Sequence, residues 1–142
     1  MNIQIIYKTR TGHTRTLANA IGDVVGITPI DITEPHNLGE VDLLIVGTGI
    51  YNGKPDQALL NYLDNLPANR IPGAAIFSSS ASGEDMTELI VNMLRSKGIE
   101  VYSKHFVCKG QRFWQARKHP NDRDIRKIQD FARKLIGAIR TA

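Results

Sequence analysis

Residues 5–16 of the 142-residue chain read IIYKTRTGHTRT, an apolar run that passes directly into three threonines around one glycine, TRTGHT. Ile3, Ile5 and Ile6 predict a short buried strand that ends near Lys8. The apolar residues that follow recur at helical spacing and share one face: Leu17, Ala18, Ile21, Val24 and Val25, with Gly26 as a typical helix stop. The segment therefore predicts a strand, a turn that contains glycine, and a helix.

The remainder of the chain repeats this alternation. Apolar runs predict four further strands, over residues 27–33, 41–49, 73–80 and 100–108. Amphipathic segments between and after them predict helices: Pro55 suits a first helical position, Ser82 and Asp85 have capping-box spacing before a helix that Gly98 ends, and Asn121 suits an N-cap. Five strands alternating with helices imply an α/β fold with a doubly wound, five-stranded parallel sheet and helices on both faces.

Length and composition restrict the class of protein. The chain fits one domain, which we expect to span residues 1–142. No segment has the pattern of a signal peptide or membrane span, and the single cysteine, Cys108, excludes an internal disulfide, so we expect a cytoplasmic protein. The formal net charge is +4, but no nucleic-acid-binding motif accompanies it, and we expect no nucleic-acid partner. His36, His105 and His119 lack ligand spacing, so we also expect no metal site.

The threonine-rich turn suits a phosphate group. In doubly wound sheets, ligands bind outside the carboxyl ends of the strands, where this turn lies. We expect Thr11 to cap the helix and Gly12 to turn tightly beside it, so that the amides of residues 12–14 converge with the hydroxyls of Thr9, Thr11 and Thr14. Neither a Walker pattern nor a three-glycine dinucleotide pattern is present, which favours one terminal phosphate.

TRTGHT after a strand resembles the T-x-T-G-x-T phosphate loop of flavodoxins, and the likeness extends over nearly the whole chain. The resemblance implies the strand order 2-1-3-4-5 and flavin mononucleotide (FMN) as cofactor. It implies a first loop that holds the phosphate, formed by Thr9, Arg10, Thr11, Gly12, His13 and Thr14. It implies two loops that flank the flavin ring, a second loop of Thr48, Gly49, Ile50, Tyr51, Asn52 and Gly53, and a third of Ser79, Ser80, Ala81, Ser82 and Gly83.

Several of these residues have an alternative interpretation. Tyr51 either stacks on the flavin or packs only against the sheet edge. Asn52 and Gly53 readily adopt positive φ, so their peptide either reorients to bond the flavin N5 or forms an ordinary turn. Of Phe113 and Trp114, one either covers the exposed flavin edge or forms a docking spot for a partner, or both close the core beneath the last helix. His13 is either a phosphate donor or a loop residue that faces solvent.

Three features depart from the pattern of strongly acidic flavodoxins. Lys54 stands where an acid is expected, the stretch SSSASGED (residues 78–85) offers no aromatic ring, and the chain is basic. A cation near the ring favours the anionic reduced flavin, which argues against a strongly reducing carrier.

The resemblance implies an FMN protein that carries electrons between redox partner proteins, or to a small redox substrate. One alternative is a small FMN-dependent oxidoreductase of the quinone or protoporphyrinogen type, and another is a flavin-free binding module that shares the fold. No residue has the pattern of a dedicated acid, base or nucleophile, which favours the carrier, because there the protein only binds, orients and tunes the flavin.

Overall fold

The structure is a computed structural model that describes residues 1–67, 70–80, 87–102, 106–109 and 121–141. The strands are β1 (Ile3–Lys8), β2 (Ile30–Asp31), β3 (Leu43–Tyr51), β4 (Lys54–Pro55), β5 (Gly73–Ser80), β6 (Glu100–Val101) and β7 (Phe106–Lys109). The helices are α1 (His13–Val25), α2 (Gln57–Asp64), α3 (Glu88–Ser96) and α4 (Asp122–Thr141).

The strands form a sheet in the order β2-β1-β3-β5-β6, and all neighbours in this series run parallel. Apart from the extra strand β4, this is the predicted order 2-1-3-4-5, so the predicted fold class is confirmed. Near-continuous aliphatic runs in β1 and β3 explain the central position of these strands, because both of their faces are buried.

The last predicted strand, residues 100–108, is present as two short strands. β6 pairs with the start of β5 and β7 with its end, so both lie along the same strand. The Tyr102 N–H still donates to the Ala74 carbonyl at 3.0 Å just after β6. The prediction of a strand here is therefore right in its place at the sheet edge, while residues 103–105 of the predicted strand lie outside the described residues.

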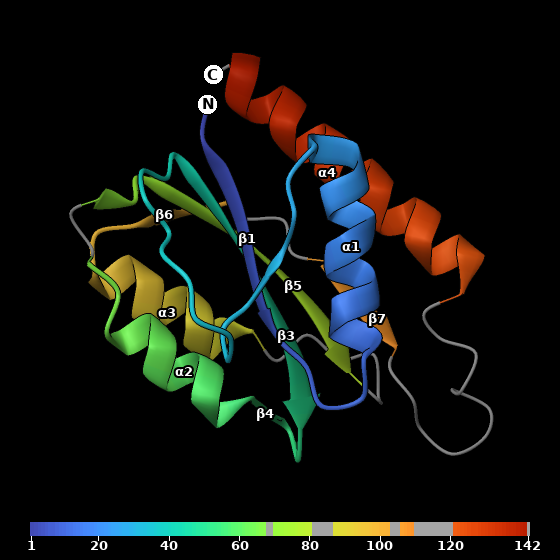
Figure 1. Cartoon of the computed structure of the whole chain (residues 1–142), viewed down its shortest axis with the longest axis horizontal. Helices are drawn as coiled ribbons and strands as arrows, with labels where there is room; N and C mark the ends of the chain where they lie inside the picture. The colour runs from blue at the N-terminus through green and yellow to red at the C-terminus, as the bar shows by residue number, and fades with distance from the viewer. Residues whose placement is uncertain (68–69, 81–86, 103–105, 110–120, 142) are drawn as a thin grey trace.

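Two apolar layers enclose the sheet. Helices α1 and α4 cover one face, and α2 and α3 cover the other (Figure 1). Successive strand residues alternate between these layers, as in Ile5 toward α1 and Ile6 toward α2. The Phe77 ring of β5 occupies the space that a side chain at Gly47 would need, which explains glycine inside that buried strand.

The turn after β3 has the positive φ values that its residue types predict, but the role of Pro55 in it differs from the prediction. Asn52 and Gly53 both have positive φ, 52° and 75°, and they close a hairpin in which Tyr51 pairs with Lys54. Two positive-φ residues are what a two-residue type I′ hairpin loop needs. Pro55 consequently belongs to β4, so the prediction that it occupies the first helical position of α2 was wrong. Asp56 caps α2 instead, since its carboxylate accepts a 2.9 Å hydrogen bond from the Ala58 N–H.

Other helix ends agree in part with the sequence patterns. Asn121 caps α4 as predicted: its side chain accepts from the Asp124 N–H at 3.0 Å, and the Asp124 carboxylate accepts from the Asn121 N–H at 2.9 Å. Gly26 ends α1 in the left-handed conformation. By contrast, α3 begins later than the Ser82 spacing predicts, with Thr87 at its N-cap.

Candidate functional site

The first loop joins β1 to α1 at the carboxyl edge of the sheet (Figure 1). Gly12 has φ of 90° and is the N-cap of α1, so the tight turn predicted there is present. The Thr9 hydroxyl accepts a 2.9 Å hydrogen bond from the Gly12 N–H and closes the loop on itself. The Thr16 hydroxyl donates to the Gly12 carbonyl at 3.0 Å, a contact that the sequence did not suggest.

The predicted cap by Thr11 is wrong. No side-chain hydrogen bond caps α1, and no acid lies in its first turn. The Thr11 hydroxyl instead lies 3.0 Å from Nδ1 of His13. Gly12 has no side chain, so the N-cap residue of α1 provides no side-chain acceptor of the kind that serine, threonine, aspartate or asparagine provides.

The other two residues of the first loop differ in burial. Thr14 is almost completely buried beneath the start of α1. Partial burial lowers the pKa of His13 below its ordinary value of 6.5, so its ring is neutral at pH 7. A neutral ring can donate one hydrogen bond but brings no positive charge until an anion lies nearby.

The second loop begins inside the sheet. Thr48 is fully buried, and its hydroxyl donates to the Gly49 carbonyl at 2.8 Å and accepts from the Asp56 N–H at 3.2 Å. Gly49 and Ile50 are also buried within β3. Thr48 therefore ties β3 to the start of α2, and a contact from this loop to a ligand would come from Tyr51, Asn52 and Gly53.

Tyr51 and Arg10 connect the second loop to the first. The Tyr51 ring lies against Gly49, where it fills the space of a missing side chain. The guanidinium carbon of Arg10 lies 4.1 Å from the centroid of the same ring, a cation–π contact. The Arg10 N–H also donates to the Tyr51 hydroxyl at 3.1 Å. Burial raises the pKa of the Tyr51 phenol, so it is protonated at neutral pH.

Asp56 is a functional candidate that the sequence patterns missed. It is 4% exposed, and its Oδ2 lies 3.2 Å from Nε of Arg10, while its Oδ1 caps α2. One buried carboxylate thus anchors Arg10 and holds the start of α2. An aspartate one residue before a predicted helix is a recognisable N-cap signal, but nothing in the sequence pairs it with Arg10.

The third loop is described only at its start. Ser79 is buried, and Ser80 ends β5 beside Lys109 of β7. The predicted ligand residues Ala81, Ser82 and Gly83 lie outside the described residues. So do Phe113 and Trp114, the aromatic residues considered as a flavin cover.

One buried hydroxyl near the end of β5 stands out. Among the described residues, Ser78 Oγ is buried without a hydrogen-bond partner. Ser78 pairs in register with Thr48, so polar groups adjoin in the two central strands at their carboxyl ends. Buried polar groups of this kind normally have partners, and the carboxyl edge is where a ligand of such a sheet binds.

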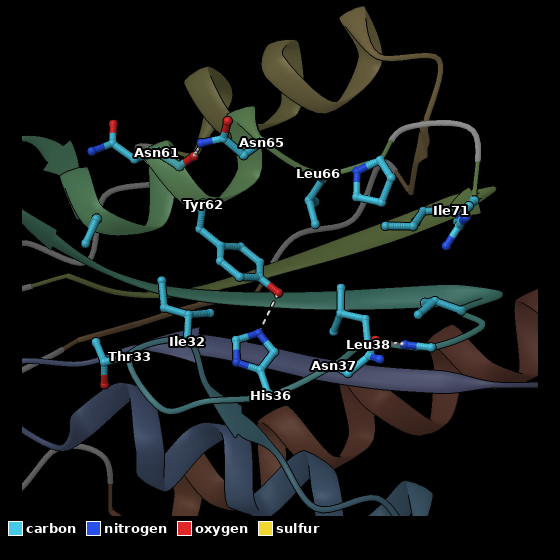
Figure 2. Close-up of a pocket in the computed structure, with 15 residues that line it drawn as sticks. Ile32, Thr33, His36, Asn37, Leu38, Asn61, Tyr62, Asn65, Leu66 and Ile71 are labelled. Carbon is cyan, nitrogen blue, oxygen red and sulfur yellow. Dashed lines mark hydrogen bonds between the residues drawn. The ribbon is translucent and has the colours of Figure 1, made fainter.

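A separate pocket of about 590 Å³ lies between α2 and the segment that links β2 to β3 (Figure 2). The Tyr62 hydroxyl lies 2.8 Å from Nε2 of His36, whose Nδ1 lies 2.6 Å from the Glu34 carbonyl. Because that carbonyl can only accept, Nδ1 carries the proton and Tyr62 donates to Nε2. Leu38 and Ile71, which precede β3 and β5, also line this pocket, so it extends toward the amino ends of the strands and away from the three loops.

The described residues contain no group of three His, Cys, Asp or Glu side chains that could hold a metal ion. None of their helices is both long enough and apolar enough to cross a membrane.

Comparison with known proteins identifies the family. A family model for the flavodoxin domain matches residues 4–112. The chain belongs to the flavodoxin family. An uncharacterized protein of Methanocaldococcus jannaschii is 28% identical over 151 residues, which cover 96% of this chain and 99% of that relative.

Solved structures share the flavodoxin fold. A flavodoxin from the domain Archaea has a TM-score of 0.77 at 19% identity, with 99% of each chain covered. The rubredoxin:oxygen oxidoreductase of Desulfovibrio gigas has a TM-score of 0.76 at 17% identity, and the match covers 99% of this chain and 36% of that enzyme. The same fold is thus found as a whole protein and as part of a larger one.

Membership of the flavodoxin family implies a flavin cofactor, and the first loop fits the phosphate of one. A side-chain carbon added at Gly12 would meet no atom of the described residues within 4 Å, so the space beside the turn is open in the described part of the chain. The start of α1 adjoins that space without a side-chain cap. Backbone N–H groups at a helix start, with threonine hydroxyls beside them, are suitable donors for a phosphate.

Proposed function

We propose that this flavodoxin-family protein binds FMN and passes electrons between redox partners. The observation that carries the proposal is the start of α1, which has no side-chain cap and faces open space beside Gly12. A phosphate there would accept hydrogen bonds from the first N–H groups of the helix and would lie at the positive end of its dipole.

The residues have distinct roles in this proposal. The first loop, Thr9 to Thr14, holds the phosphate, and the Thr9 hydroxyl fixes the turn through Gly12. Tyr51, Asn52 and Gly53 of the second loop and the residues of the third flank the flavin ring. When bound, the flavin accepts and releases the electrons, so the chain needs only to bind it and set its surroundings.

The charged side chains of this edge support a carrier more than an enzyme with its own acid or base. Arg10 is paired with Asp56, and Arg15 lies 3.6 Å from Asp31. Both pairs tie one segment of the site to another. In the described part of the site, these carboxylates therefore have structural partners and are not positioned as free proton donors or acceptors.

The test is a comparison of FMN with riboflavin, which differ only in the phosphate. Flavin-free protein is titrated with each, and the quenching of flavin fluorescence is followed. One or two charge-assisted hydrogen bonds to the phosphate are worth about 1.5–3 kcal/mol each, so we expect FMN to bind at least tenfold more tightly. Equal affinities would contradict the phosphate site, and binding of neither flavin would favour a flavin-free module.

A further inference from the structure

Among the described residues, the charged side chains in and beside the first and second loops are predominantly positive. We define the cationic edge as Lys8, Arg10, Arg15 and Lys54. Lys8 ends β1, Arg10 lies in the first loop, Arg15 belongs to the first turn of α1, and Lys54 begins β4. The β3–β4 hairpin and the loop after β1 reach the same edge in Figure 1. These four residues therefore lie in or next to the first and second loops.

The carboxylates paired with this edge face inward. Arg10 is 56% exposed and its partner Asp56 is 4% exposed, while Arg15 is 53% exposed and Asp31 is 12% exposed. A molecule that approaches the edge therefore meets guanidinium groups before it meets carboxylates.

Two lysines add positive charge that these carboxylates do not balance. The Lys8 ammonium group donates to the Thr9 carbonyl, which carries no formal charge. Lys54 is exposed in the hairpin. Four cations with two paired carboxylates leave a formal surplus of two positive charges on the cationic edge. Glu34, an exposed acid, follows β2, which runs parallel to β1, so it lies at the same edge of the sheet and opposes one of these charges.

The opposite edge of the sheet has a mixed character. Glu40 and Asp42 precede β3, and Glu100 begins β6, and all three are exposed. Arg70 precedes β5 at the same end and is also exposed. These four residues sum to a formal charge of −2, so the positive surplus belongs to the edge where the flavin would bind and is not shared by the opposite edge.

From this distribution we infer that the cationic edge is the docking face for a small acidic electron-transfer protein. The inference rests on the proposed FMN site. A redox partner has to approach the flavin closely, which restricts it to this edge, and complementary charge there speeds encounter and aligns the partner. A protein partner fits better than a nucleic acid, because the four cations of the described residues gather around one group of loops.

The experiment uses FMN-loaded protein and two probes of opposite charge. In the first reaction, a reduced acidic [2Fe–2S] ferredoxin transfers one electron to the bound flavin, so the cluster is oxidised by one electron and the flavin is reduced by one. In the second, the reduced flavoprotein transfers one electron to ferric cytochrome c, a basic protein. Stopped-flow absorbance gives both rate constants over a range of ionic strength. We expect the ferredoxin rate constant to fall and the cytochrome c rate constant to rise as salt is added.

Two charge-reversal variants distinguish the effect of charge at the cationic edge from the effect of the protein's net charge on the rate constants. Lys54→Glu alters the cationic edge, and Arg70→Glu makes the same change in net charge at the opposite end. At low ionic strength, we expect Lys54→Glu to slow the ferredoxin reaction about three- to tenfold and Arg70→Glu to slow it less than about twofold. The flavin midpoint potentials of each variant are measured alongside, and rate constants are compared at equal driving force.

The outcomes are distinguishable. If FMN does not bind at all, the proposed function fails before any kinetics are measured. If FMN binds but Lys54→Glu and Arg70→Glu have equal effects, or the salt dependences have the opposite signs, the docking face is wrong. A short single-stranded RNA that binds the native protein, loses affinity in Lys54→Glu and blocks the ferredoxin reaction would also overturn the inference, because it would assign the edge to nucleic acid.

Discussion

The guanidinium carbon of Arg10 lies 4.1 Å from the centroid of the Tyr51 ring, and this contact joins the phosphate loop to the hairpin that would flank the flavin. The ring is held against Gly49 and beneath Arg10. A flavin that stacks on this side of Tyr51 would have to replace the guanidinium. Removal of the ring therefore distinguishes the two interpretations of Tyr51. FMN binding weakens if the ring stacks on the flavin, and it stays the same if the ring packs only at the sheet edge.

Two substitutions at Tyr51 separate the ring from its hydroxyl. Tyr51→Phe removes the acceptor of the Arg10 N–H and keeps the ring, so we expect FMN affinity to change little. Tyr51→Ala removes the ring, and loss of stacking should weaken FMN binding by about 0.5–1.5 kcal/mol and reduce fluorescence quenching. Flavin titration of the native protein and both variants gives the comparison. If Tyr51→Ala binds and quenches like Tyr51→Phe, the ring packs only at the sheet edge.

Substitutions at Asp56 separate the helix cap from the ion pair with Arg10. Asn is as good an N-cap as Asp, so Asp56→Asn keeps the cap and removes the charge that holds Arg10. Asp56→Ala removes both. We expect the free energy of unfolding to fall by roughly 1 kcal/mol for Asn, because Arg10 is largely exposed, and by about 1 kcal/mol more for Ala. Urea denaturation of flavin-free protein measures both values, and equal losses would show that the cap contributes nothing.

The ion pair predicts a second result for the same variants. If Asp56→Asn acts through Arg10, combining it with Arg10→Met should cost less than the sum of the two single substitutions. Additive losses would mean that the 3.2 Å contact between Nε of Arg10 and Asp56 contributes no coupling energy in solution.

Burial of His13 predicts a dependence of stability on pH. Its pKa in the folded protein is below the ordinary value of 6.5, so the unfolded chain binds this proton more readily than the folded one. Stability therefore decreases as the pH falls below about 6.5 and is regained above it. In His13→Asn this loss should be smaller between pH 7.5 and 5.5, because Asn does not titrate. Urea denaturation of flavin-free protein across this range tests it, and identical pH profiles would exclude the shift.

The buried parallel strands were predictable because the apolar runs around Ile5 and Ile45 are nearly continuous. Their order came from the resemblance to flavodoxins. The positive φ of Asn52 and Gly53 was also predictable from residue type, although the hairpin that they close was not. Pro55 was misassigned because proline suits both a first helical turn and a short edge strand. The contact of Arg10 with Asp56 joins residues 46 positions apart, and no local pattern reports such a pair.

Gly12 provides a test of the phosphate loop with a matched control. Gly12 and Gly26 have φ of 90° and 75°, and a side-chain carbon at either would meet no atom within 4 Å. Alanine at each should therefore cost a similar strain, roughly 1–2 kcal/mol of stability. Only Gly12→Ala should reduce the preference for FMN over riboflavin, because only that methyl group would enter the phosphate space. Equal flavin preferences in the two variants would place the phosphate elsewhere.

Lys54 predicts how this family member differs from a strongly reducing carrier. It is exposed at the start of β4 and pairs with Tyr51, the residue of the second loop proposed to face the flavin. A cation here favours the negative charge that the flavin gains in its second one-electron reduction. With an effective dielectric constant of about 20–40 and a separation of roughly 8 Å, one charge shifts that midpoint by tens of millivolts before salt screening.

Lys54→Glu should therefore lower the second midpoint potential by at least that amount at low salt, and less at high salt. Arg70→Glu, with the same change in net charge at the opposite end, should leave it nearly unchanged. Spectroscopic redox titration of the three proteins at two ionic strengths gives the values. A midpoint that stays constant or rises in Lys54→Glu would mean that the ammonium group points away from the flavin, and the mild potential expected of this protein would then need another source.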